Sequence, residues 1–302
     1  MVKNLVLENI SVGFKLPQGV FYAVDDVSLS LPGGNFTAII GESGCGKSVL
    51  GQAILNILPS GVIKKGRVLY NGEQVKKILS AFGIIPQNPS ESLNPVRKIG
   101  KQMQDILDVH NIADSSNSYK KQCLRLFGLE ETERVLAAYP HELSGGMLQR
   151  VLCAMAVSSK PEWILADEPT KGLDEQVGAV VRKNLLTIKQ DLHLSMLIIT
   201  HDIALAQEVC DDVLVMYAGQ VLEHNADIWH KPLHPYTKGF LQALPKNGLQ
   251  VIPGKAPVPG ESFTGCKFAA RCPYCTTRCK EEKPAMQQVG NAEVRCFLYA
   301  EG

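Results

Sequence analysis

The first part of the chain is patterned as strands that lead into one helix. Residues 23–31 alternate between apolar and polar side chains, and a Pro-Gly-Gly turn follows at 32–34. The apolar run 36–40 then enters a glycine-rich segment, after which apolar side chains recur at helical spacing over 49–57. Alternation is typical of half-buried strands, and the i, i+3, i+4 recurrence is typical of an amphipathic helix. This region therefore predicts strands followed by a strand–loop–helix unit.

The middle of the chain changes to helical patterning before strands return. Strand signals fade after residue 88, so we expect a helical insert at about 88–160. Beyond it, apolar runs and amphipathic segments alternate regularly. The expected strands are 163–166, 196–200, 213–217 and 220–223, and the expected helices are 175–190 and 204–209. Strands that alternate with helices predict a parallel α/β sheet.

Length and composition add a second domain and exclude some classes of function. A chain of 302 residues suggests two domains. Proline and glycine punctuate residues 249–260, so we expect a core at 1–248 and a cysteine-rich extension at 249–302. The net charge of +1 gives no basic footprint for nucleic acid. The longest apolar run, 151–157, is far short of the ~20 residues of a membrane-spanning helix, and we expect a cytosolic protein.

The glycine-rich segment at 41–48, Gly-Glu-Ser-Gly-Cys-Gly-Lys-Ser, fits the phosphate-binding pattern G-x-x-x-x-G-K-[ST]. Its glycines let backbone N–H groups curl around phosphates, Lys47 supplies positive charge, and the Ser48 hydroxyl can bind Mg²⁺. Cys45 is expected to serve only as a small residue of the loop. The predicted nucleotide-binding residues here are Gly41, Ser43, Gly44, Cys45, Gly46, Lys47, Ser48 and Val49.

Polar side chains follow three of the expected strands. Asp167 and Glu168 end an apolar strand, where a parallel sheet places its active groups. Adjacent side chains on a strand point to opposite sides, so Asp167 can meet Mg²⁺ through water while Glu168 deprotonates the attacking water. His201 follows the next strand and can hydrogen-bond the γ-phosphate or the water. Gln87 follows a further expected strand at 83–86 and can join the Mg²⁺ shell. Each residue alone has a structural interpretation; together they favour catalysis.

The segment Leu143-Ser144-Gly145-Gly146 begins another helix, with Ser144 as the expected N-cap. Apolar residues recur at i, i+3, i+4 and i+7 along it, so we expect the helix to pack by one face. Its free N–H groups and positive dipole end can face an anion. One triphosphate seldom needs two such helix ends from one chain. We therefore predict that Ser144, Gly145 and Gly146 serve the nucleotide of a neighbouring subunit.

Five of the nine cysteines crowd into one segment, spaced Cys266-x5-Cys272-x2-Cys275-x3-Cys279-x16-Cys296. Such clustering in a cytosolic chain favours metal over disulfides. Four thiolates can hold zinc or an iron–sulfur cluster. The plainer role of such a site is to staple a short segment that has no core of its own.

Taken together, the phosphate loop, Gln87, residues 143–146, Asp167-Glu168, Asp174 and His201 resemble ABC-type ATPases in order and spacing. The resemblance spans about residues 4–244. It implies an α/β fold: a P-loop NTPase core with an N-terminal antiparallel β subdomain and a helical insert. It also implies that two such chains hold two ATP molecules, each between the loop of one chain and the Ser-Gly-Gly of the other.

The same resemblance assigns two further positions. Asp174 would communicate across the interface between the two ATPases, although Lys171 and Gly172 depart there from the usual small residues. An aromatic side chain from an early loop would stack on adenine. Phe14 and Tyr22 both qualify, and we favour Phe14.

Residues 233–239, Leu-His-Pro-Tyr-Thr-Lys-Gly, resemble a hallmark of oligopeptide, dipeptide and nickel importers. Pro235 suits a first helical turn, so the motif indicates the family and not catalysis. In that family the tail binds a [4Fe-4S] cluster. The matching positions are Cys266, Cys272, Cys279 and Cys296, while Cys275 departs from the pattern and can compete as a ligand, and zinc remains the alternative.

The function that this resemblance implies is to hydrolyse ATP for a membrane importer of peptides, or of a related ligand such as a nickel complex. The implied partners are a second, different ATPase subunit, two transmembrane permease subunits and an extracytoplasmic substrate-binding protein. This chain would lie at the cytoplasmic face of the membrane, with its helical insert docked on a permease. A soluble ABC ATPase acting on nucleic acid or ribosomes is the alternative, but the stretch between Ser48 and Ser144 leaves no room for a long coiled coil.

Overall fold

The computed structural model describes residues 3–17, 19–74, 81–173, 175–258, 261 and 263–300. The chain divides into two compact units. The phosphate-loop unit comprises Asn4–Leu31, Thr37–Val75 and Cys210–Gly302, and the helical unit comprises Met1–Lys3, Pro32–Phe36 and Lys76–Val209. Each unit therefore combines segments that are far apart in the sequence.

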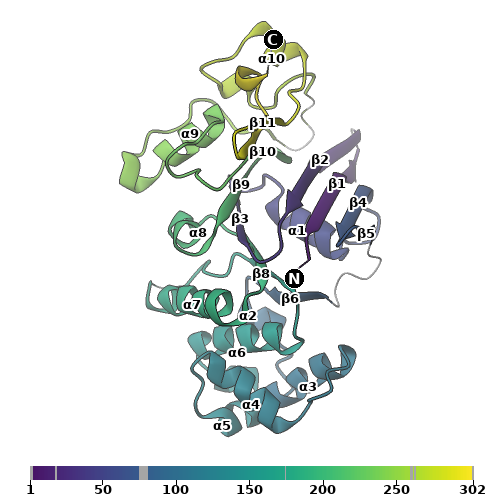
Figure 1. Cartoon of the computed structure of the whole chain (residues 1–302), viewed down its shortest axis with the longest axis vertical. Coiled ribbons are helices and arrows are strands. Elements are labelled where there is room, and N and C mark those ends of the chain that lie inside the picture. Colours follow the sequence, from purple (N-terminus) through teal and green to yellow (C-terminus); the bar gives the residue numbers. More distant parts are fainter. Residues whose placement is uncertain are drawn as a thin grey trace. The chain divides into compact units, whose positions relative to one another are not determined.

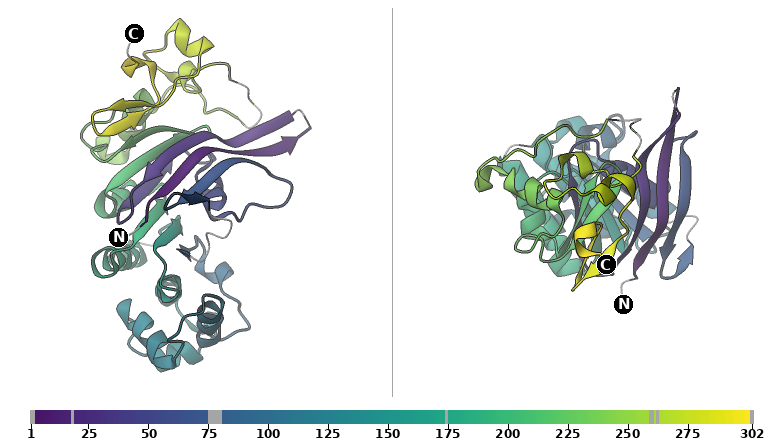
Figure 2. Two further views of the ribbon diagram at one scale, coloured as in Figure 1. Left: turned by 45° about the vertical axis from the view of Figure 1, so that its right-hand side comes forward. Right: turned by 90° about the horizontal axis from the view of Figure 1, so that it is seen from above.

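An antiparallel sheet opens the phosphate-loop unit. Its strands are β1 (Leu5–Leu16), β2 (Gly19–Leu31), β4 (Ile63–Tyr70) and β5 (Glu73–Gln74), in the order β2-β1-β4-β5. They lie side by side, purple to dark blue, in both views of Figure 2. The inward positions of β1 and β2 are apolar and buried, which is the alternation that the sequence predicts.

A second set of strands in the same unit carries the phosphate loop. β3 (Phe36–Gly41) is buried throughout and pairs in parallel with β9 (Asp212–Tyr217). β9 pairs antiparallel with β10 (Gln220–Asn225). β10 pairs with β12 (Ala292–Val294), which forms the C-terminal hairpin with β11 (Gln287–Val289). The remaining elements are α1 (Lys47–Leu55), α9 (Pro235–Gln242), α10 (Thr277–Glu281) and 3-10 turns at Pro245–Asn247, Ala269–Arg271 and Phe297–Tyr299.

The helical unit contains three parallel strands in the order β8-β7-β6: β6 (Phe82–Ile85), β7 (Trp163–Asp167) and β8 (Ser195–Ile199). Its helices are α2 (Pro89–Ser92), α3 (Ile99–Val109), α4 (Asn117–Leu126), α5 (Thr132–Ala137), α6 (Gly145–Ser158), α7 (Glu175–Thr187) and α8 (Ile203–Val209), with a 3-10 turn at Pro140–Glu142 and a π-helical turn at Ile188–Leu192. Figure 1 shows α3, α4 and α5 gathered beneath α6.

Helix α6 is more deeply buried than its apolar stripe predicts. Every residue from Val151 to Ser158 is buried, because α2, α3 and α4 contact the helix together with α7 and β6. Of the rest of the helix, Gly145, Gly146, Met147 and Arg150 are exposed or half-buried. The prediction of packing by one face was therefore wrong for the body of the helix, while its N-terminus remains accessible.

The predicted α/β class, with an antiparallel β subdomain and a helical insert, is confirmed. No helix in the described part of the chain is long and apolar enough to span a bilayer. The expected boundary at residue 249 stays a prediction.

Candidate functional site

The phosphate loop between β3 and α1 needs glycine at two positions. Gly41 has φ 148°, and a Cβ there would lie 2.1 Å from the carbonyl oxygen of Met216. Gly46 has φ 104°, and a Cβ there would lie 2.1 Å from the carbonyl oxygen of Ala23. Any larger residue would collide with backbone that cannot move aside. Both the conformation of the loop and its close packing against neighbouring backbone therefore require the two glycines of the motif.

Lys47 opens α1 and is only 7% exposed. Its Nζ donates to the carbonyl oxygens of Gly41 at 2.9 Å and Glu42 at 3.1 Å. The ammonium thus lies within the loop that the motif predicts to bind phosphates. Ser48 follows in the first turn of α1 and is half-buried, whereas Ser43 and Gly44 are exposed.

Glu42, a variable position of the motif, has partners that the sequence did not reveal. Its backbone N–H donates to the Tyr236 hydroxyl at 3.2 Å. Its carboxylate accepts hydrogen bonds from Nη1 of Arg271 at 3.1 and 3.2 Å. Both partners lie beyond residue 230, so no local pattern could have identified them.

The two candidates for adenine stacking lie on neighbouring strands. Phe14 on β1 is half-buried and faces Phe21 on β2 in the strand register. Tyr22 and Gly44 line a cavity of about 310 Å³ that Phe14 does not line. The preference for Phe14 stays a prediction.

The carboxyl ends of β7 and β8 bring Glu168 and His201 together. Oε2 of Glu168 lies 2.6 Å from Nδ1 of His201 and also accepts from the backbone N–H of His201 at 3.3 Å. Glu168 is buried, and its backbone is in the left-handed region with φ 47°. A non-glycine residue in this region is strained, and such strain is concentrated at functional sites. The carboxylate is therefore held in one orientation by a neighbouring strand end.

The other predicted residues of the helical unit occupy strand ends and a helix start. Asp167 ends β7 and is half-buried, and Gln87 follows β6 and is exposed. Ser144 caps α6, its hydroxyl accepting from the N–H of Met147 at 3.3 Å, as predicted. Ser144 and Gly145 are exposed, so this helix end is open to an anion from outside the chain. Asp174 lies outside the described residues.

Four of the five clustered cysteines line one cavity of about 170 Å³, here called the four-cysteine cavity. They are the four predicted ligands, Cys266, Cys272, Cys279 and Cys296. Burial, with a smaller contribution from the neighbouring thiols, raises the pKa of Cys266 to about 11. Cys275 is absent from the lining, and its thiol donates to the carbonyl oxygen of Thr276 at 3.5 Å. Among the described residues, no three His, Cys, Asp or Glu side chains are arranged to hold a single metal ion.

His234 of the hallmark motif also lines the four-cysteine cavity and is 1% exposed. Its Nδ1 accepts from the N–H of Tyr236 at 2.9 Å. This hydrogen bond caps α9, which begins at Pro235 as the motif predicts. The ring is therefore neutral with its hydrogen on Nε2, and burial lowers the pKa of His234 to about 3. Nε2 has no hydrogen-bond partner within the described chain. No sequence pattern indicates this unpaired donor.

His224 joins the C-terminal hairpin to the core strands. On β10, its Nε2 lies 3.2 Å from Asp212 on β9, and its Nδ1 lies 3.3 Å from Glu293 on β12. Burial opposes protonation, but the two carboxylates outweigh it and raise the pKa of His224 above its ordinary value. The His224 imidazole thus bridges the hairpin to the strand that pairs with β3.

We expect the docking of this hairpin to weaken as the pH rises. A histidine with a raised folded-state pKa stabilises fully below its unfolded value near 6.5, and this stabilisation is lost as the pH rises through the folded value. Hydrogen exchange at the β11–β12 amides should therefore show more opening at pH 8 than at pH 6, after correction for intrinsic rates. His224→Gln should remove most of the difference. A pH response that survives in this variant would assign it to another group.

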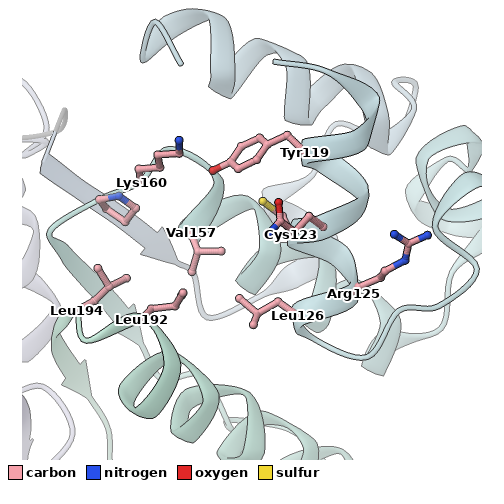
Figure 3. A pocket seen from close by; sticks show the side chains of 10 residues that line it. Tyr119, Cys123, Arg125, Leu126, Val157, Lys160, Leu192 and Leu194 are labelled. Carbon is pink, nitrogen blue, oxygen red and sulfur yellow. The ribbon is translucent and has the colours of Figure 1, made fainter. Parts of the chain in front are cut away.

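A groove of about 630 Å³ in the helical unit lies apart from these motifs. Figure 3 shows Leu126, Val157, Leu192 and Leu194 projecting into it, with Tyr119 and Lys160 at one side. None of the predicted nucleotide or metal residues lines this groove. We therefore do not assign the nucleotide to it.

Comparison with known proteins identifies two regions of the chain. Residues 24–171 match the family model described as "ABC transporter", and residues 222–279 match "Oligopeptide/dipeptide transporter, C-terminal region". The oligopeptide transport ATP-binding protein OppD of Haemophilus influenzae is 34% identical over 98% of both chains. The dipeptide transport ATP-binding protein DppD of Escherichia coli is 36% identical over 95% of this chain and 94% of the relative.

Solved structures agree with this assignment. CbiO1 from Clostridium perfringens, part of an ABC transporter complex, matches with a TM-score of 0.61 and 27% identity over 74% of this chain and 88% of that one. A dimeric ATP-binding cassette in a post-hydrolysis state with ADP and Pi matches with a TM-score of 0.61 and 25% identity over 73% and 97%. The chain therefore belongs to the ATP-binding subunits of the oligopeptide and dipeptide family of ABC transporters.

Proposed function

We propose that this chain hydrolyses ATP to energise the import of peptides through a membrane complex. The observation that carries the proposal is the combination, in one chain, of a phosphate loop and the peptide-transporter C-terminal region, at 34–36% identity to OppD and DppD over nearly the full length. A nickel complex is the alternative cargo. We also propose that this chain is a peripheral subunit at the cytoplasmic face of the membrane.

The proposed ATP site uses the predicted residues in distinct roles. Backbone N–H groups of residues 43–48 and the Lys47 ammonium bind the phosphates, and Phe14 stacks on adenine. Ser48, Gln87 and Asp167 hold Mg²⁺, which neutralises charge on the phosphates. The oxygen-rich donor set of hydroxyl, amide and carboxylate suits that ion.

Glu168 is the proposed general base. Its carboxylate, oriented by His201, accepts a proton from water as the water oxygen bonds to the γ-phosphorus. The bond between the γ-phosphorus and the bridging oxygen breaks, and ADP leaves with the electron pair. His201 stays exposed enough, at 57% of its side chain, to reach the γ-phosphate with its other ring nitrogen.

The exposed start of α6 is the proposed half-site for a neighbour's nucleotide. Ser144, Gly145 and Gly146 present free N–H groups at the positive end of a 14-residue helix. Asp174 is proposed to communicate across the same interface. We propose that the neighbour is a second, different ATPase, because the importer group that this chain resembles commonly uses two different ATPases.

A groove of about 570 Å³ is the proposed docking site for a cytoplasmic helix of a permease subunit. It is lined from β6, α2, α3 and α6, close to Gln87. Apolar side chains such as Ile106, Leu152 and Met155 line it. An amphipathic helix laid into such a groove buries its apolar face, and its motion can reach the loop that carries Gln87.

We further propose that Cys266, Cys272, Cys279 and Cys296 hold a [4Fe-4S] cluster, whose irons take one thiolate each. The four thiols line one cavity, which supports a site that takes one thiolate from each of them, and zinc remains the alternative. The orphaned Nε2–H of His234 on that cavity would find an acceptor in a cluster sulfur. When bound, the cluster would cross-link a short segment that has little core of its own.

Purification from membranes tests the proposed function. Extracted in mild detergent and washed with salt, the tagged full chain should retain two integral membrane proteins and a second ATPase of different sequence. Reconstituted with a substrate-binding protein, the complex should accumulate labelled peptide only when ATP is present, and a labelled nickel complex serves as the competing cargo. Retention of nucleic acid instead of membrane proteins would favour the soluble alternative.

A further inference from the structure

Glu42 of the phosphate loop is held by the C-terminal part of the chain at both its backbone and its side chain. The Tyr236 hydroxyl accepts from its N–H at 3.2 Å, and Arg271 donates to both carboxylate oxygens at 3.1 and 3.2 Å. Tyr236 belongs to α9, and Arg271 ends the turn Ala269–Arg271. The loop is therefore fastened from outside its own strand and helix.

Arg271 has a fixed position in the fold. Its side chain is only 7% exposed, and that of Glu42 is 26% exposed. Nη1 also donates to the Tyr217 hydroxyl at 3.3 Å, and Nε donates to the carbonyl oxygen of Pro253 at 3.1 Å. An ion pair largely shielded from water is weakly screened by salt. Loss of Arg271 would leave the Glu42 carboxylate uncompensated in a loop that binds a triphosphate.

Both residues that hold Glu42 are connected to the four-cysteine cavity. Arg271 directly precedes Cys272, a lining residue of that cavity. His234, another lining residue, accepts the N–H of Tyr236 at 2.9 Å. Two separate connections therefore run from the cavity to the same residue of the phosphate loop.

A buried aromatic cluster supports these connections. Phe268 lines the cavity, is 1% exposed, and packs edge-on against Tyr217 at 5.4 Å and Tyr236 at 5.5 Å between ring centroids. The rings of Tyr217 and Tyr236 lie 4.6 Å apart. Close-packed rings cannot shift independently, so a displacement at the cavity wall reaches the residues that contact Glu42.

We propose that the cysteine-rich extension positions the phosphate loop through Glu42, with Arg271 as the positioning residue, so that an intact four-cysteine site raises the affinity for ATP. The inference rests on the proposed function, because ATP is the ligand of the loop. By linkage, ATP binding in turn stabilises the filled cysteine site. The extension thereby acts on the nucleotide site in addition to its role as a structural staple.

Equilibrium binding of a fluorescent ATP analogue with Mg²⁺ to the anaerobically purified full chain tests this inference. Arg271→Gln should raise the Kd about tenfold, because it exposes the bound phosphates to an unpaired carboxylate. Arg271→Lys should retain part of the affinity. Arg134→Gln, which breaks an exposed ion pair with Glu131, is the matched control and should bind as the parent chain does.

The double variant Glu42→Gln/Arg271→Gln separates charge from folding. Because no carboxylate is left to compensate, the Kd of the double variant should lie within about threefold of the parent Kd. If it binds as poorly as Arg271→Gln, Arg271 only maintains the fold and the proposal fails.

Cys272→Ser tests the connection to the cysteine site. Made alone, it should raise the Kd by a factor similar to that of Arg271→Gln. Made together with Arg271→Gln, it should raise the Kd little beyond the value of Arg271→Gln alone. An unchanged Kd in either single variant would overturn the inference while leaving the proposed function intact. Failure of the parent chain to bind the analogue would instead count against the proposed function.

Discussion

Glutamine in place of Glu168 should leave ATP binding intact and lower the hydrolysis rate by about 10²–10⁴-fold. The amide has nearly the same shape as the carboxylate but cannot accept a proton from water. The carboxylate lies directly after β7, and its Oε2 is held by the ring and the backbone N–H of His201, an arrangement that suits the proposed role. The strained left-handed backbone at Glu168 further restricts where the side chain can go.

Single-turnover hydrolysis and nucleotide binding, measured on the same preparations, check this prediction. Glu162→Gln is the matched control. Glu162 directly precedes β7, at the opposite end of the strand from Glu168, and its carboxylate pairs with Lys3 at 3.0 Å. Because hydrolysis is the step that should be blocked, Glu168→Gln should also accumulate an ATP-bound complex with its partner ATPase. Near-normal turnover by Glu168→Gln would remove Glu168 as the base.

Serine at any one of the four cavity cysteines should abolish or strongly reduce bound iron, whereas Cys275→Ser should leave it unchanged. A [4Fe-4S] cluster needs four thiolates, and a serine hydroxyl is a poor substitute for a soft ligand. Cys266, Cys272, Cys279 and Cys296 line one cavity, and Cys275 is directed to the carbonyl oxygen of Thr276. Cys275 is thus a control in the same segment.

Iron and zinc analysis of anaerobically purified full-length protein, with its visible and electron paramagnetic resonance spectra, provides the measurement. The parent chain and Cys275→Ser should be brown and contain about four irons per chain. One zinc per chain without visible absorption would show that the cysteines hold zinc and not an iron–sulfur cluster. Loss of iron in Cys275→Ser would show that the fifth cysteine, and not only the cavity set, is required.

Local features of the sequence were sufficient to predict the phosphate loop and the helix starts. Gly41 and Gly46 are needed because their backbones have positive φ and pack against other backbone, and Ser144 caps α6 through a hydrogen bond three residues away. Such requirements are confined to a few consecutive residues, so they leave a recognisable pattern. Alternating and helical periodicities likewise predicted the α/β class, because they reflect which face of each element is buried.

Contacts between distant residues required the tertiary structure. Nothing near Glu42 in sequence indicates Arg271, which lies 229 positions away, or Tyr236, 194 positions away. The complete burial of the body of α6 also escaped prediction, because it depends on how many elements surround the helix. The spacing of the five cysteines left Cys275 as a competitor, and only the packing of the extension directed it away from the cavity. By itself, the sequence determined which chemical groups the chain carries and the local conformations that present them. The tertiary structure decided which groups meet, because burial and strand pairing bring together residues whose separation along the chain carries no information about their distance in space.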